Sequence, residues 1–279
     1  MRKMRLGLSF VVAAVSFLLL VACGDDDSDF ATRPPEGPSS SSVIQQSSSS
    51  VKSSSSVASS SSEKAVSSSS KVSVPVEVTT GTMTDSRDGQ MYKTVTIGTQ
   101  TWMAENLNYE MDSSFCYNDS AKYCAKYGRL YTWAAAMDSV GTWSANGKGC
   151  GFEKTCSPTY PVRGICPDGW HLPTKAEFET LFTAVGGQST AGKMLKSTTG
   201  WAAYSGITNE DAFAFSALPA GYRYYYGYYY FEGSNAYFWS STESNRSYAY
   251  SVCLYYNNDN AYLGNGGKGY GFSVRCLQD

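Results

Sequence analysis

The chain has 279 residues, a formal net charge of −2 and 42% hydrophobic residues. This length is ample for a buried core. The slightly acidic balance and the absence of a basic stripe argue against nucleic acid as a partner, because phosphate binding needs clustered Lys and Arg. One His stands against 22 Tyr, so histidine chemistry is confined to a single position.

The N-terminus has the pattern of a secretory signal. Three cations precede an apolar run over 6–22, which is short for a permanent membrane span. The run ends in Leu20-Val21-Ala22-Cys23, which resembles the lipobox of bacterial lipoproteins. The resemblance implies a signal peptide over 1–22 and a lipidated Cys23 that attaches the protein to a membrane, since each buried CH₂ contributes about 0.8 kcal/mol. The alternative is a signal peptide or anchor with an incidental cysteine.

The segment 23–84 is predicted to be a tether. Asp25-Asp26-Asp27 resembles the surface-export signals of some Gram-negative lipoproteins, so we expect an outer-membrane lipoprotein exposed on the cell surface. Five SSSS blocks follow, separated by short pieces. So little apolar surface cannot offset the entropy of ordering, and the segment should be disordered. The Ser-rich part, residues 31 to about 73, reaches roughly 35–40 Å as a flexible chain.

Residues 85–279 contain all six Trp and all 22 Tyr and are predicted to form one α+β domain. The expected order is a strand, two to three helices and then an antiparallel meander in which 236–241 lies beside 271–277. Glycine-rich turns such as 264–267 should join the last strands. The predicted helices are 130–137, 174–185 and 192–196, and the predicted strands are 91–97, 213–218, 236–241, 248–256 and 271–277.

The segment GWHLPTKAEFETL contains the only histidine, His171, and raises the question of catalysis. Thr174-Lys175-Ala176-Glu177 has the pattern of a capping box, so Glu177 already has a structural role. The apolar residues that follow recur at helical spacing, and two glycines end the helix. His171 has no second histidine and no nucleophile at a readable spacing. We therefore expect a packed, hydrogen-bonded core residue, although a spatial triad is not visible in sequence.

A tyrosine-rich run over 221–233 offers the strongest candidate for ligand binding. The rings cannot all face one core, because neighbours on a strand alternate between faces. With regular alternation, the even-numbered tyrosines would share one exposed side unless Gly227 introduces a bulge. Exposed rings with a hydroxyl suit the faces of sugars or protein partners. The alternative is an aromatic hairpin packed on itself. The candidate ligand-binding residues are Tyr222, Tyr224, Tyr226, Tyr228 and Tyr230.

Seven cysteines follow Cys23, and in an exported protein they are disulfide candidates before they are metal ligands. Zinc would need CxxC pairs or histidine partners, and neither is present, so no metal or other cofactor is expected. Cys116 with Cys124, and Cys150 with Cys156, bracket short loops and are natural pairs. Three cysteines then remain for one bridge and one free thiol. Cys166–Cys276 is favoured, Cys253–Cys276 competes with it, and Cys253 is the expected free thiol.

Several motifs resemble known families. HLPTKAEFE is similar to a segment of formylglycine-generating-enzyme-like domains, a branch of the C-type lectin fold. A fuller match, over most of 85–279, is to the Fibrobacter succinogenes major paralogous domain, found in exported lipoproteins behind Ser-rich linkers. The resemblance implies a C-type-lectin-like fold but no established activity. It rests on DGQMYKTVTIGTQTWMAENLNY, YGRLYTWAAAM, GICPDGWHLPTKAEFETL, AFSALPAGYR, AYFWSSTE and GFSVRC, in this order.

No catalytic motif emerges from these residues. The formylglycine-generating oxidases use two nearby cysteine thiolates on copper, whereas Cys253 and Cys276 lie 23 apart. The triplets of calcium-dependent sugar lectins are missing. A glycosidase needs two opposed carboxylates, and Glu105, Asp211, Glu232 and Glu243 lie in no recognisable motif. We therefore expect a surface-anchored, non-catalytic recognition or cell-envelope lipoprotein, with polysaccharide as the leading ligand. The alternatives are a structural envelope protein or a divergent enzyme using scattered carboxylates.

Overall fold

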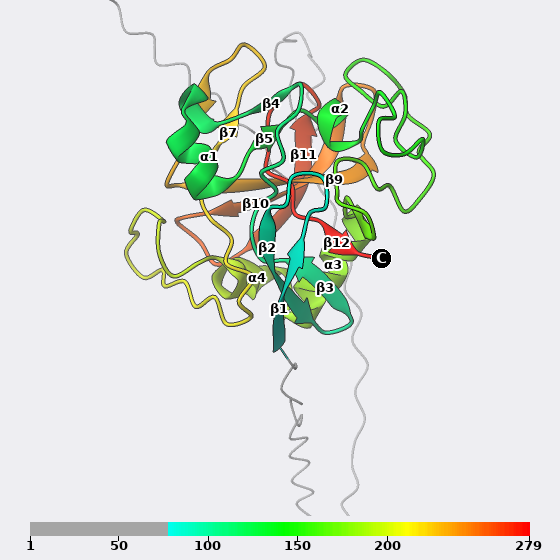
Figure 1. Ribbon diagram of the computed structural model, residues 1–279. Coiled ribbons are helices and arrows are strands. Elements are labelled where there is room, and N and C mark those ends of the chain that lie inside the picture. Colours follow the sequence, from blue (N-terminus) through cyan, green and yellow to red (C-terminus); the bar gives the residue numbers. More distant parts are fainter. Residues whose placement is uncertain (1–77) are drawn as a thin grey trace, which may run out of the picture. The chain divides into compact units, whose positions relative to one another are not determined.

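The computed structural model describes residues 78–279 (Figure 1). The predicted signal peptide, Cys23 and the Ser-rich blocks lie outside the described residues. Within 78–279, no helix combines the length and the apolar character needed to cross a membrane.

Antiparallel sheets and short helices build the fold, as the α+β pattern predicts. The largest sheet has the order β1-β2-β3-β12-β6, so β12, near the C-terminus, lies between the two earlier strands β3 and β6. A second sheet has the order β11-β10-β9, and two small pairs are β4-β5 and β7-β8. The strands are β1 Val78–Thr84, β2 Met91–Ile97, β3 Gln100–Met103, β4 Ser114–Phe115, β5 Leu130–Tyr131, β6 Trp170–His171, β7 Tyr222–Arg223, β8 Tyr229–Tyr230, β9 Asn235–Glu243, β10 Tyr248–Tyr255, β11 Ala261–Gly267 and β12 Leu277–Gln278.

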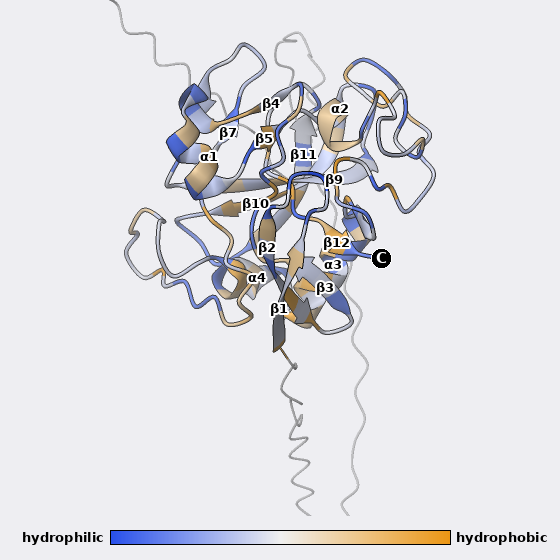
Figure 2. Ribbon diagram, viewed as in Figure 1, coloured by the Kyte–Doolittle hydropathy of each residue, from blue (hydrophilic) through white to orange (hydrophobic). Residues whose placement is uncertain are grey.

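Four α-helices lie in the described part of the chain: α1 Ala121–Tyr127, α2 Trp133–Ala136, α3 Lys175–Ala184 and α4 Gln188–Leu195. A 3₁₀ turn over Tyr117–Asp119 precedes α1. The predicted capping box of α3 is confirmed, because Thr174 Oγ1 accepts from Glu177 N and the Glu177 carboxylate accepts from Thr174 N. In Figure 2, α2 is coloured as hydrophobic, whereas hydrophilic and hydrophobic colours alternate along α1.

The core has two principal parts. One lies between β2, β3, α3 and α4, where the Trp102 and Phe178 rings are 5.1 Å apart. The other is rich in aromatic residues and includes Trp239, whose ring stacks on Phe272 at 4.2 Å. The predicted closeness of 236–241 and 271–277 is confirmed, since Trp239 N donates to Ser273 O at 3.1 Å.

Some predicted elements are wrong, and each has a local cause. The helix expected over 130–137 is β5 followed by the shorter α2, which begins after the cap Thr132. The strand expected over 213–218 is an irregular loop, because Ala214 and Ser216 have positive φ angles of 53° and 52°. The strand expected over 271–277 is reduced to single bridges and to β12.

Two further differences concern the glycine-rich segment 264–267 and the residue at which the fold begins. The 264–267 segment, expected as a turn, belongs to β11. Its glycines make room for aromatic rings, because a Cβ on Gly266 would lie 2.4 Å from the Phe272 ring. The fold also begins before residue 85: β1 pairs with β2 along its whole length, so seven residues assigned to the tether belong to the sheet. The helix α1 was not expected.

Three predicted disulfides are present: Cys116–Cys124, Cys150–Cys156 and Cys166–Cys276. The last one spans 110 residues and fixes the C-terminal segment to the loop before β6. The prediction of a free thiol at Cys253 is wrong, because no cysteine within 78–279 is free. Cys253 is fully buried in β10, within the run predicted as a strand.

His171 lies beside this disulfide-bonded C-terminal segment and is hydrogen-bonded as a packed residue, as predicted. Its side chain is 7% exposed, and its two ring nitrogens lie 2.7 Å from Asp279 Oδ1 and 3.0 Å from Glu177 Oε1. Burial alone would lower the pKa of His171, but the two carboxylates outweigh burial and raise it above the usual 6.5. The protonated ring can donate to both partners, so it joins β6, the start of α3 and the C-terminus.

Removing the long-range bridge should cost more stability than removing a short one. In the chain-entropy account, closing 110 residues contributes about 5 kcal/mol, and closing eight contributes about 2.5 kcal/mol. We expect Cys166→Ala with Cys276→Ala to lower the free energy of unfolding more than Cys116→Ala with Cys124→Ala. Denaturant titration of both double variants measures the difference. Equal losses would contradict this ranking.

His171→Gln should lower the free energy of unfolding by about 1–3 kcal/mol through a lost buried hydrogen bond. The raised pKa makes this contribution complete below pH 6.5 and lost as the pH rises through the folded-state value. At low pH, the charge of Glu177 sets the limit. Burial would raise the pKa of Glu177, but hydrogen bonds from His171 and Thr174 lower it below 4.5, so the stabilisation by His171 is lost only below that pH. Unfolding curves from pH 4.5 to 9 should show the variant and the parent converging at high pH. A difference in unfolding free energy that stays constant with pH would contradict the stabilising role of the protonated His171 ring.

Candidate functional site

The tyrosine-rich run forms a short hairpin beside α1 (Figure 1). Tyr222 pairs with Tyr230, and Arg223 pairs with Tyr229. The chain then turns, with Gly227 N donating to Tyr224 O and Tyr224 N to Tyr228 O. The pairing therefore extends over two residues on each side, and a loop occupies the tip.

The expected alternation of the even-numbered tyrosines is wrong because of this turn. Tyr222 is 1% exposed and lies in the core. Tyr224 is half-buried, with its ring 5.0 Å from Tyr270, and Tyr230 is also half-buried. Only Tyr226 and Tyr228 are exposed among the five candidates, at 71% and 64%. The hairpin packs largely on itself and still leaves rings in solvent.

A groove of about 430 Å³ lies next to the hairpin tip and is lined mainly by aromatic residues. Tyr225, Tyr248 and Phe152 are 48%, 46% and 56% exposed. The Tyr225 ring lies nearly parallel to that of Tyr270, at 7° and 6.1 Å. The other lining residues are Glu153, Ser247, Gly267 and Gly269. We call this surface the tyrosine groove.

The polar edge of the tyrosine groove is held in place by its own contacts. Glu153 Oε1 accepts from Ser247 Oγ at 2.7 Å, and Glu153 Oε2 lies 2.7 Å from Arg246 Nη2. Gly269 allows the hairpin to approach, because a Cβ there would lie 3.3 Å from Tyr225 Cβ. A carboxylate and phenol hydroxyls thus border apolar ring surfaces. Sequence reasoning missed Tyr225, Tyr248 and Phe152, because they come from three separate segments that only the fold brings together.

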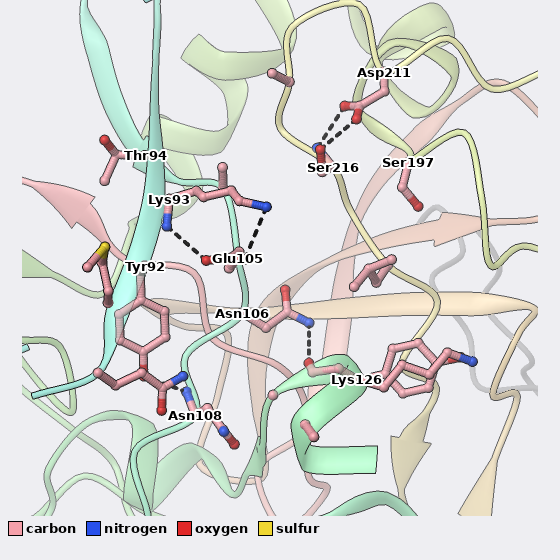
Figure 3. Close-up of a pocket in the computed structure, with 18 of the residues that line it drawn as sticks. Tyr92, Lys93, Thr94, Glu105, Asn106, Asn108, Lys126, Ser197, Asp211 and Ser216 are labelled. Carbon is pink, nitrogen blue, oxygen red and sulfur yellow. Dashed lines mark hydrogen bonds and ion pairs between the residues drawn. The ribbon is translucent and has the colours of Figure 1, made fainter. Parts of the chain in front are cut away.

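A second, larger cavity is polar (Figure 3). It has a volume of about 710 Å³ and lies between β2, the 104–108 segment, the end of α1 and the 197–218 loop. In Figure 3, side chains from these elements surround one open space. The side chains labelled there include Lys93, Glu105, Asn106, Lys126, Ser197, Asp211 and Ser216. We call this cavity the polar cleft.

Arg275 joins two walls of the polar cleft through hydrogen bonds. Its guanidinium is fully buried and donates to Asn106 Oδ1 at 2.8 Å, to Ser216 O at 2.9 Å and to Phe215 O. Burial lowers the pKa of Arg275 to about 9. Burial also disfavours the charged form of Asp211 and therefore raises its pKa, although hydrogen bonds from Ser216 N and Oγ oppose the rise.

The four carboxylates considered for catalysis do not gather at one point. Glu105 and Asp211 line the polar cleft. Glu232 instead accepts from the Tyr127 hydroxyl and from Lys126. Glu243 pairs with the buried Lys268 and accepts from Cys156 N. Within residues 78–279, no group of three His, Cys, Asp or Glu side chains could hold a metal ion.

Comparison with known proteins gives one match. The model of the Fibrobacter succinogenes major domain matches residues 95–278. No curated protein matches the chain, and no solved structure matches it. Because the match covers well over half of the sequence, the chain belongs to the Fibrobacter succinogenes major domain family.

Proposed function

We propose that this protein is a non-catalytic recognition lipoprotein of the cell surface that binds polysaccharide at the tyrosine groove. The observation that carries the proposal is the set of partly exposed rings from three segments, Phe152, Tyr225 and Tyr248, around one groove. Ligand sites are commonly concave and lined by aromatic side chains with a few polar groups, as this groove is.

The chemistry of the groove fits a sugar chain. A pyranose ring has apolar C–H faces and equatorial hydroxyls, and aromatic rings with a phenol hydroxyl complement both. Tyr225 and Tyr270 offer nearly parallel rings, and Glu153 supplies acceptor oxygens at the edge. Tyr226, whose ring lies 4.0 Å from that of Tyr225, extends this aromatic surface beyond the groove. An extended polymer could therefore contact several rings in succession.

Attachment to the membrane completes the proposal. Lipidation at Cys23 would hold the protein in the outer membrane, and the Ser-rich segment would place the domain away from the lipid surface. We also assign the domain to the C-type-lectin-like class, supported by the sequence resemblance and by the pairing of β12 beside β3. An experimental structure with a different topology would remove that assignment.

Substitution of the groove rings should weaken polysaccharide binding. We expect Tyr225→Ala with Tyr248→Ala to raise the dissociation constant more than about tenfold, because each anchoring ring commonly contributes about 1 kcal/mol or more. Depletion of the full-length protein, purified in detergent, by insoluble cellulose, xylan and peptidoglycan gives the binding isotherms.

The matched control is Tyr204→Ala. Tyr204 is 51% exposed, close to the 46% of Tyr248, but does not line the groove. The control should bind as the parent does, and thermal melts should show that all variants are folded. A folded groove variant with parental binding to every polymer that the parent binds would contradict the proposal, as would a parent that binds none of them.

A further inference from the structure

We propose that the polar cleft is a second binding site, which takes a short, neutral, polyhydroxylated ligand such as an oligosaccharide of a few units. This site is separate from the tyrosine groove and does not depend on it. The two surfaces share no lining residue.

The size and preformed shape of the cleft suit a small ligand. Its volume of about 710 Å³ falls within the range of about 300–1,000 Å³ that is usual for such sites. The buried Asn106 donates to Tyr127 O at 2.8 Å and accepts from Arg275 Nε, so the end of α1 and the base of the cleft are joined. Arg275 also holds Ser216 O on the opposite wall. Fixed walls reduce the ordering cost of binding.

Backbone strain is concentrated on one wall. Asp211, Ala214 and Ser216 have φ angles of 47°, 53° and 52°, in the left-handed region that favours glycine. Each such residue costs on the order of 1–3 kcal/mol and persists only where its surroundings enforce it. Here Asp211 accepts from Ser216 N at 2.7 Å and from Ser216 Oγ at 2.6 Å, and Arg275 holds the adjacent carbonyls. Backbone strain that is held in place at a cavity wall indicates that the conformation of this wall serves a function, which we take to be ligand binding.

The charges of the lining select a neutral ligand. Two cations, Lys93 and Lys126, stand against two carboxylates, Glu105 and Asp211, so the formal sum is zero. Lys93 lies 3.6 Å from Glu105, Asp211 is bonded to Ser216, and Lys126 pairs with Glu232 outside the lining. An ionic ligand would have to break one of these pairs or remain unpaired after desolvation.

The remaining groups favour hydroxyls over aromatic ligands. The lining offers hydroxyl and amide side chains that are exposed at Thr80, Thr198 and Thr199 and partly exposed at Gln90 and Asn108, whereas Asn106, Ser197 and Ser216 are hydrogen-bonded within the fold. Its two tyrosines, Tyr92 and Tyr127, are 1% and 2% exposed and present no ring face for stacking. Recognition must therefore rest on hydrogen bonds, with small apolar contacts at Ala104, Ala125 and Leu218.

Calorimetric titration of the full-length protein in detergent tests this site with defined probes. The neutral probes are the β-linked tetrasaccharides of glucose, xylose and mannose, and the charged probes are trigalacturonate and the glucosamine trimer. We expect at least one neutral probe to bind and both charged probes to bind about tenfold more weakly or not at all. Absence of binding by every neutral probe, or equal binding of charged probes, would overturn the proposal.

Two substitutions fill the cleft from different walls. Ala125→Trp on α1 and Thr198→Trp on the facing loop replace exposed residues that line it, and each should weaken the neutral probe at least about tenfold. Ala121→Trp is the control, because Ala121 is exposed on the same helix but does not line the cleft. Two variants on separate walls keep the test valid if one fails to fold. Parental binding in either folded variant would overturn the site.

The groove variant Tyr225→Ala with Tyr248→Ala separates this inference from the proposed function. It should bind the tetrasaccharide as the parent does, even where it loses insoluble polysaccharide. Loss of the tetrasaccharide in this folded variant would place the sugar in the tyrosine groove and would overturn the polar cleft as its site.

Discussion

The fold depends on buried cations that donate to the carbonyls of its loops. Long irregular segments leave carbonyl groups without a strand or helix partner, and a buried carbonyl without a donor is costly. Lys196 donates to Tyr255 O and Asn258 O, Lys268 donates to Lys154 O, and Arg275 donates to Phe215 O and Ser216 O. All three side chains are fully buried. Each therefore connects a strand or helix end to a distant loop that has little regular structure of its own.

The same contacts position both candidate sites. Arg275 holds the strained wall of the polar cleft, and Lys268 connects the start of the 267–271 turn to the loop that contributes Phe152 and Glu153 to the tyrosine groove. The disulfide Cys150–Cys156 closes that loop on the other side. Loops that carry recognition residues are usually mobile, and fixing them lowers the entropy cost of binding. In each site, a buried cation thus holds a loop in place by donating to one or more of its backbone carbonyls.

The features predictable from sequence were those with local signals. Thr174 and Glu177 define a capping box within four residues, and the short cysteine pairs enclose loops that can close on themselves. The partner of Cys276 could be narrowed only to two alternatives, Cys166 and Cys253. The segments that failed were decided by distant contacts: 213–218 alternates like a strand, but Asp211 and Arg275 bend it, and the glycines of β11 serve the rings of Tyr270 and Phe272.

The candidate site was less predictable than the fold. Five tyrosines were selected from one run because alternation could be counted there, yet the turn at Gly227 decides which rings reach solvent. Tyr225 was passed over for its odd position, and Tyr248 and Phe152 lie in other segments with no motif of their own. The polar cleft left no signal beyond scattered hydroxyls and two unassigned carboxylates, Glu105 and Asp211.

The cost of burying cations explains why they occur where they do. Burial lowers the pKa of Lys196 to about 8 and that of Arg275 to about 9, which means that each charge is held against a desolvation penalty. A chain that could place ordinary strands in these positions would avoid that penalty. Strands, however, present side chains in strict alternation, so only every second residue of a strand can face a given cavity. One buried cation can donate to the carbonyls of a loop segment, which leaves the side chains of that segment free to face a ligand. For Arg275, the penalty is therefore tied to the loop that forms one wall of the polar cleft.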